Sequence, residues 1–69
     1  MNDFIKLHYA NTQEEICIRK EKIYRFKESE IVKNISPEKC TQIFLSENYE
    51  DWIKVSETVD EIMEMLEHE

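Results

Sequence analysis

The sequence predicts an α+β fold, in which an antiparallel, bent or barrel-like sheet of about five strands carries one C-terminal helix. Five short segments alternate apolar and polar side chains with a period of two, as half-buried strands do. The C-terminal segment instead follows the spacing of an amphipathic helix. A chain of 69 residues buries a small core with a narrow stability margin, so we expect one small domain over residues 1–69.

Three strands are predicted in the N-terminal part of the chain. Residues 4–9 and 14–19 flank the segment Ala-Asn-Thr-Gln, which has turn chemistry, so we expect them to form a hairpin. Residues 22–27 continue the alternation after a bend near Lys20 to Lys22. The chain has no glycine, which disfavours two-residue turns with positive φ, and we therefore expect connections of three to five residues.

A loop is predicted over residues 28–39, followed by two more strands. The loop segment mixes charges with scattered apolar residues and contains Pro37, which disfavours helix at Ser36. Strands are then expected at 40–46 and 51–56, separated by the polar segment Glu-Asn-Tyr-Glu-Asp.

A helix is predicted over about residues 58–67. Thr58 and Glu61 fit a capping box, in which each side chain satisfies a backbone donor at the helix start. The apolar stripe that should face the sheet consists of Val59, Ile62, Met63 and Leu66. The opposite, acidic side carries Asp60, Glu61, Glu64 and Glu67.

The alternation assigns the strand side chains to two faces. The face expected beneath the helix is aliphatic and comprises Ile5, Leu7, Ile16, Ile18, Ile23, Ile43, Leu45, Ile53 and Val55. The other face is aromatic and comprises Phe4, Tyr24, Phe26, Phe44 and Trp52. Five exposed aromatics would form an unusually large apolar patch, and such patches mark contact sites.

Three explanations of the aromatic face are open. A symmetric homodimer could cover it, the 28–39 loop could fold over it, or it could form a groove for a foreign ligand. That ligand would be either a host protein or a small molecule with a base that stacks on an aromatic ring.

The net charge of −7 argues against a nucleic-acid partner, because binding to phosphates depends on clustered Lys and Arg. The charge either keeps the protein in solution or attracts a basic surface of another protein. No apolar run approaches the roughly 20 residues that span a bilayer, and the N-terminus has no signal-peptide pattern. We therefore expect a cytoplasmic protein with no membrane partner.

The sequence predicts no catalytic, cofactor-binding or metal site. Cys17, Cys40, His8 and His68 lack the paired, close spacing of zinc ligands, so the cysteines are expected to be reduced small hydrophobes. A dyad of Cys17 and His8 would fit on the first two strands, but no third residue or oxyanion donor accompanies it. We expect that the protein is not an enzyme and needs no cofactor.

Three segments, FIKLHYANTQEEICIRKEKI, TQIFLS and IKVSETVDEIMEML, resemble the small flagellar FlbD family and short FlbD-like proteins of bacteriophages and mobile elements. The most recognisable part of that group is the junction Val-x-Glu-[Ser/Thr]-x-x-Glu-[Val/Ile]. Here its positions are Val55, Glu57, Thr58, Glu61 and Ile62. The resemblance implies a five-strand unit followed by one helix, and a non-enzymatic accessory protein without catalytic residues.

The expected function is a small, homo-oligomeric protein-interaction or accessory module of bacterial or phage origin. The alternative is a phage counter-defence protein that inhibits a host immune protein or sequesters a nucleotide signal. The expected partners are another copy of the chain and a host protein with a basic surface. The predicted contact residues are Phe4, Tyr24, Phe26, Phe44, Trp52, Glu61, Glu64 and Glu67.

Overall fold

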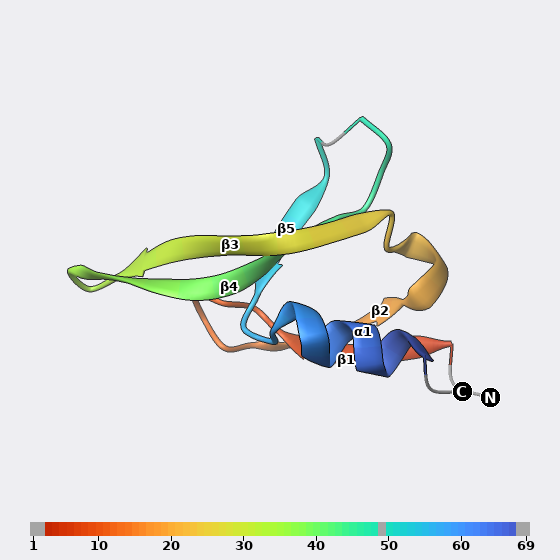
Figure 1. Ribbon diagram of the computed structural model, residues 1–69, viewed down its shortest axis with the longest axis horizontal. Helices are drawn as coiled ribbons and strands as arrows, with labels where there is room; N and C mark the ends of the chain where they lie inside the picture. Colours follow the sequence, from red (N-terminus) through yellow and green to blue (C-terminus); the bar gives the residue numbers. More distant parts are fainter. Residues whose placement is uncertain (1–2, 49, 68–69) are drawn as a thin grey trace.

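The computed structural model describes residues 3–48 and 50–67, and in this part of the chain it has five strands and one C-terminal α-helix (Figure 1). The elements are β1 (Phe4–His8), β2 (Glu15–Arg19), the 3-10 turn η1 (Lys20–Lys22), β3 (Arg25–Lys33), β4 (Ser36–Phe44), β5 (Trp52–Val55) and α1 (Val59–Glu67). All strand pairs are antiparallel. The predicted α+β class is confirmed, with bent, open sheets rather than a closed barrel.

The strands form two sheets that meet at one crossing. β1 pairs with β2, and β3, β4 and β5 form the second sheet in that order. The chain after β1 then runs antiparallel to β5 through a bridge between Tyr9 and Val55. On either side of this bridge, Ala10 N donates to Lys54 O at 2.9 Å and Ser56 N donates to His8 O at 2.8 Å. The crossing joins the two sheets into one strongly bent surface.

The hydrophobic core lies between the two sheets and α1. Its buried members are Ile5, Leu7, Ile18, Ile43, Val55 and Ile62, and Ile16, Ile23, Leu45 and Ile53 are among the half-buried residues that pack against them. All nine residues of the predicted aliphatic face therefore belong to the core or its border. This part of the sequence interpretation is confirmed.

The prediction of a loop over residues 28–39 is wrong. These residues belong to one long hairpin in which β3 and β4 pair from Arg25 and Phe44 to Lys33 and Ser36. The apolar alternation is weak because residues 28–39 are at most half-buried, and alternation reports burial rather than strand geometry. Pro37 is tolerated because β5 pairs only with residues 41–44 of β4, which leaves β4 as an edge strand at Pro37.

The expected length of the connections is also wrong at this hairpin. Lys33 pairs with Ser36, so Asn34 and Ile35 alone form the turn. Asn34 has a φ of 57°, in the left-handed region that asparagine enters more readily than most residues. Asparagine here takes the place of the glycine that the chain lacks.

The outer part of this hairpin projects from the rest of the molecule. Residues 29–40, which we call the arm, extend beyond the last β5 pairing at Thr41. Figure 1 shows the arm reaching away from α1 and from the β1–β2 hairpin, in a molecule of 41 × 24 × 19 Å.

The helix begins with the predicted capping box. Thr58 N donates to Glu61 Oε1 at 2.9 Å, and Glu61 N donates to Thr58 Oγ1 at 3.1 Å. Ile62 is fully buried, but Met63, which was expected in the buried stripe, is 47% exposed. Met65 packs against the core instead. The two methionines flank the stripe on opposite sides, and the core covers the Met65 side.

This orientation of α1 predicts that Ile62→Ala destabilises the fold by about 2–5 kcal/mol, because it removes fully buried methyl groups and leaves a cavity. Met63→Ala, one position away, should change the free energy of unfolding by no more than about 0.5 kcal/mol. Urea unfolding followed by circular dichroism measures both. Equal losses at the two positions would show that the helix is oriented differently.

Candidate interaction surfaces

The five predicted aromatic residues do not form one exposed patch. Phe26 lies opposite Ile43 in the β3–β4 register and packs against the core, so its predicted place on the outer face is wrong. The alternation breaks between η1 and β3, which places both Ile23 and Phe26 on the core side. Phe44 does point away from Ile43 but is 92% buried, and the Arg25 guanidinium lies 5.7 Å from its ring centre.

The other three aromatics are about half exposed. Phe4 lies on β1 with the Arg19 guanidinium 5.1 Å from its ring centre, and Trp52 lies on β5 with Lys54 Nζ at 5.7 Å. Tyr24 lies between η1 and β3. Phe4 and Trp52 belong to different sheets, so the exposed aromatics are separate candidate contact points rather than one face of a single sheet.

The acidic residues predicted as contacts lie on the exposed side of α1. Residues 57–67 contain five carboxylates and no Lys or Arg. Glu64 and Glu67 are exposed, whereas Glu61 has a structural task because its carboxylate caps the helix. Of the predicted acidic contacts, Glu61 is therefore the one that cannot be altered without affecting the start of the helix.

The arm carries the two most exposed large hydrophobic side chains among the described residues. The side chains of Val32 and Ile35 are 75% and 96% exposed, and Pro37 is exposed beside Val32. The arm also contains two acids and two lysines, and Lys33 Nζ lies 3.9 Å from Glu38 Oε2. An arm without net charge on a chain of charge −7 is distinct from the acidic remainder of the molecule.

A cleft of about 280 Å³ lies beside β5 and is lined by Tyr9, Asn11, Ile31, Trp52, Ile53 and Lys54. Trp52 and Lys54 alternate with Ile53 and Val55, so they lie on the side of β5 away from the core. Lys54 Nζ donates to Glu30 O at 2.9 Å. We call this site the Trp52 cleft. It is slightly smaller than pockets for small molecules, which measure about 300–1,000 Å³, and it suits one or two side chains.

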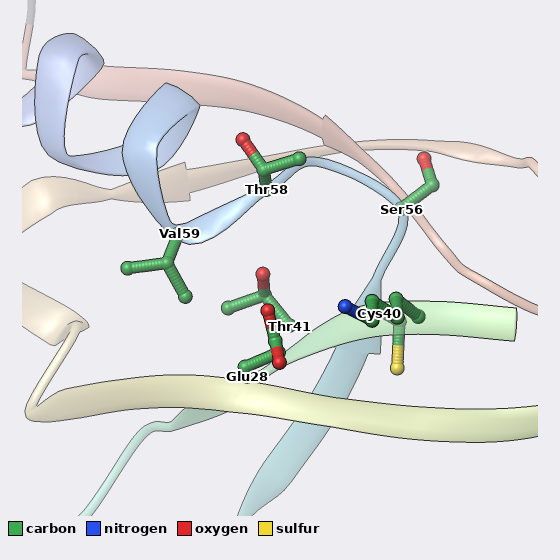
Figure 2. Close-up of a pocket in the computed structure, with 7 residues that line it drawn as sticks. Glu28, Cys40, Thr41, Ser56, Thr58 and Val59 are labelled. Atoms are coloured by element: carbon green, nitrogen blue, oxygen red, sulfur yellow. The ribbon is translucent and has the colours of Figure 1, made fainter.

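A smaller cavity of about 80 Å³ lies between β4 and the start of α1 (Figure 2). Its lining residues are Glu28, Lys39, Cys40, Thr41, Ser56, Thr58 and Val59. Figure 2 shows the Cys40 sulfur pointing to the other side of β4 from the Thr41 hydroxyl. Burial raises the pKa of the Cys40 thiol, an effect opposed by Lys54 and reinforced by Glu30. The protonated thiol is a poor nucleophile and a poor metal ligand.

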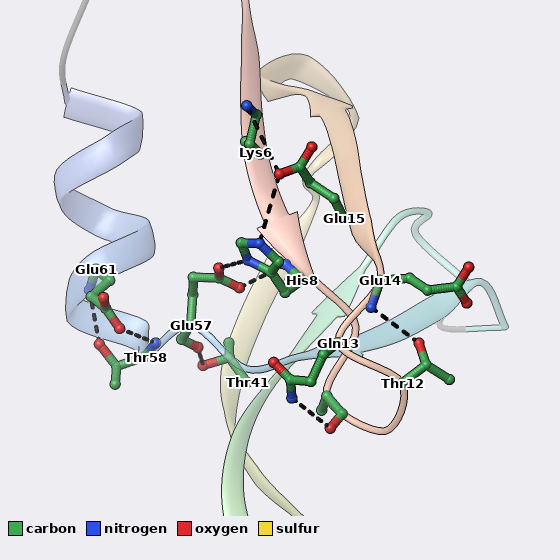
Figure 3. A network of polar contacts seen from close by, with 11 residues as sticks. Lys6, His8, Thr12, Gln13, Glu14, Glu15, Thr41, Glu57, Thr58 and Glu61 are labelled. Atoms are coloured by element: carbon green, nitrogen blue, oxygen red, sulfur yellow. Dashed lines mark hydrogen bonds and ion pairs between the residues drawn. The ribbon is translucent and has the colours of Figure 1, made fainter.

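A carboxylate and an imidazole connect β1 to the segment between β5 and α1 (Figure 3). Glu57 is 12% exposed, and its two carboxylate oxygens accept from His8 N at 2.9 Å and from His8 Nδ1 at 2.7 Å. Because an ionised carboxylate only accepts, the Nδ1 atom carries the proton. Thr41 Oγ1 also donates to Glu57 O at 2.7 Å. The pair fastens the crossing of the two sheets.

The other ring nitrogen of His8 faces a second carboxylate. His8 Nε2 lies 3.8 Å from Glu15 Oε2, which is also 3.9 Å from Lys6 Nζ. Cys17 lies on the same outer face of the β1–β2 hairpin and is exposed. Among the described residues, both ring nitrogens of His8 therefore lie beside carboxylates, and these contacts orient the imidazole.

Within residues 3–48 and 50–67, no three His, Cys, Asp or Glu side chains gather as metal ligands would. His68, the remaining soft ligand weighed from the sequence, lies outside the described residues. No helix in the described ranges is long and apolar enough to cross a membrane. No family model, curated protein or solved structure matches the chain, so the FlbD-like resemblance stays a prediction.

Sequence reasoning named Trp52 but missed the rest of its cleft. Tyr9 ends the predicted strand over residues 4–9, and Ile31 lies in the predicted loop over residues 28–39. The cleft forms only because the β1–β5 crossing brings Tyr9 beside β5 and the hairpin brings Ile31 across β4. No local signal marks such a site, because its members come from three separate segments of the chain.

The structural role of Glu57 predicts that Glu57→Ala destabilises the fold by about 1–3 kcal/mol, because it leaves the His8 backbone N–H without its acceptor. Glu15→Ala removes the other carboxylate beside His8 but only an exposed ion pair, so it should cost at most about 1 kcal/mol. Chemical unfolding compares the two variants. A larger loss at Glu15 would contradict the fastening role of Glu57.

The helix cap predicts opposite outcomes for two charge reversals on the acidic side of α1. Glu61→Lys should destabilise the fold by about 0.5–2 kcal/mol, because it removes the acceptor of Thr58 N and places a cation at the positive end of the helix dipole. Glu67→Lys should be neutral or stabilising, because a cation is favoured at the other end. Thermal unfolding by circular dichroism distinguishes them, and equal effects would exclude the cap as the cause.

Proposed function

We propose that this chain is a small, non-enzymatic interaction module that self-associates through the arm. The observation that carries the proposal is the exposure of Val32 and Ile35, 75% and 96%, at the end of an ordered hairpin. Exposed apolar side chains on a projecting element favour contact with another protein.

Charge favours a second copy of the chain as the partner. Two chains of charge −7 repel each other at long range, but the arm has no net charge and can approach its counterpart without a local penalty. A specific interface of about 800 Å² per partner would cover about one-sixth of the 5153 Å² surface of the chain. The exposed outer edge of β3 adds backbone groups that can pair with another strand.

For the biological setting we propose an accessory module of bacterial or phage origin, in line with the FlbD-like resemblance of the sequence. The same arm would also serve a counter-defence protein that inhibits a host immune protein, with the acidic side of α1 as a second surface for a basic partner. Sequestration of a nucleotide is less well supported. Lys54 is the one cation among the six residues that line the Trp52 cleft, and phosphates need more positive charge.

The proposal predicts that the double variant Val32→Ser, Ile35→Ser abolishes self-association without unfolding the chain, because both side chains are exposed. Light scattering coupled to size exclusion should give the wild type about twice the 8.4 kDa chain mass, and the variant the mass of one chain. Raising the salt concentration should strengthen wild-type association by screening the acidic remainder.

Met63→Ser is the matched control, because Met63 is also an exposed apolar residue but lies on α1. It should associate as the wild type does. A wild type with the mass of one chain at every concentration would contradict the proposal, as would an equal loss of association in the Met63→Ser control.

A further inference from the structure

Among the described residues, two apolar features stand open to solvent. Ile35 stands at the tip of the arm with 96% of its side chain exposed. The Trp52 cleft is an open apolar hollow with Tyr9, Ile31 and Trp52 among its walls. Ile35 protrudes as a knob and the Trp52 cleft is a hole that could receive it. Within a single chain, the length of the arm holds the two apart.

We propose that the Trp52 cleft of one copy receives Ile35 of a second copy, and that the exchange is reciprocal in a twofold dimer. The inference rests on the proposed self-association and names the surface that receives the arm. In an interface of this symmetry, a contact of residue i with residue j is matched by one of j with i, so two knobs fill two clefts.

The size and chemistry of the cleft suit this occupant. A volume of about 280 Å³ accommodates an aliphatic side chain and part of its turn, and the aromatic walls provide apolar contact area. Lys54 has three N–H donors, of which Glu30 O accepts one. The others can donate to the carbonyl groups of the Asn34–Ile35 turn, which lie outside the β3–β4 pairing.

The layout of the arm also permits the exchange. Ile35 immediately precedes β4, and Gln42 on β4 pairs with Lys54. Along the chain these two residues lie on opposite sides of Glu38, about 23 Å apart at roughly 3.3 Å per residue. A twofold axis that crosses the arms near Glu38 and Lys39 therefore places the tip of each copy level with Lys54 of the other. Ile31, opposite Glu38 in the register and on the same face as Lys54, then lies near the axis.

The charges near the proposed twofold axis do not prevent contact between the two copies. Glu38 would approach its own counterpart, but Lys33 lies 3.9 Å from it in the same chain and offsets its charge. The acidic side of α1 is on the core side of the sheet, away from the face that carries Trp52 and Lys54. The acidic helices of the two copies therefore remain apart in this arrangement.

The decisive experiment mixes two variants that fail for different reasons. Ile35→Asp replaces the inserted apolar side chain with a charged one and leaves the cleft intact. Trp52→Ala removes a wall of the cleft and leaves Ile35 intact. Each alone should raise the dimer dissociation constant at least tenfold, as measured by sedimentation velocity. An equimolar mixture should associate more tightly than either variant alone, because Ile35 of the Trp52→Ala chain enters the intact cleft of the Ile35→Asp chain.

A second cleft variant covers the case in which Trp52→Ala does not fold. Asn11→Trp adds a side chain at the exposed rim of the cleft and should block it while circular dichroism and the unfolding midpoint stay near the wild-type values. It should show the same rescue when mixed with Ile35→Asp.

The outcomes separate this inference from the proposed function. If Ile35→Asp abolishes association while both cleft variants dimerise as the wild type does, the arm is the interface but the cleft is not its receptor, and the inference is overturned. Mixtures no tighter than their components overturn it as well. A monomeric wild type overturns the proposed self-association itself.

Discussion

The fold depends on the crossing at which the chain after β1 pairs with β5. Each hairpin has only one apolar face, and neither can bury that face alone. The Tyr9–Val55 bridge and its two flanking hydrogen bonds bring the faces together, and the core then draws its members from both sheets and α1. Glu57 strengthens the crossing by accepting two hydrogen bonds from His8 immediately before the helix starts. A chain of this length gains its narrow stability margin from that closure.

The parts of the fold that the sequence predicted are those with a local physical cause. The aliphatic face followed from period-two burial, and the start of α1 followed from the Thr58 and Glu61 capping box. The crossing had no such signal, because it joins segments near the two ends of the chain. The arm was missed for the opposite reason: apart from Cys40 its residues are half-buried or exposed, so its strands carry no strong apolar pattern, and Asn34 supplies a turn without glycine.

The candidate contact residues also divide into those with a local signal in the sequence and those that depend on tertiary structure. Trp52 was identified because an aromatic residue opposite a core face is conspicuous in the sequence. Phe26 was misassigned because the 3-10 turn before β3 breaks the alternation, and a break of one residue moves a side chain to the other face. The walls that Tyr9 and Ile31 add to the cleft depend entirely on tertiary structure. Local sequence patterns can therefore identify one residue of a candidate contact surface without identifying the other residues that form it.

The arm also has an energetic meaning. Ordering each backbone residue costs about 1–2 kcal/mol, and in the body of the protein apolar burial offsets this cost. Backbone pairing holds β3 and β4 together in the arm, but Val32 and Ile35 bury little surface there and contribute almost nothing to the core. A polar hairpin would serve the isolated chain equally well. Apolar side chains at these positions gain stability only when another surface removes them from water, which is the energetic basis of the proposed self-association.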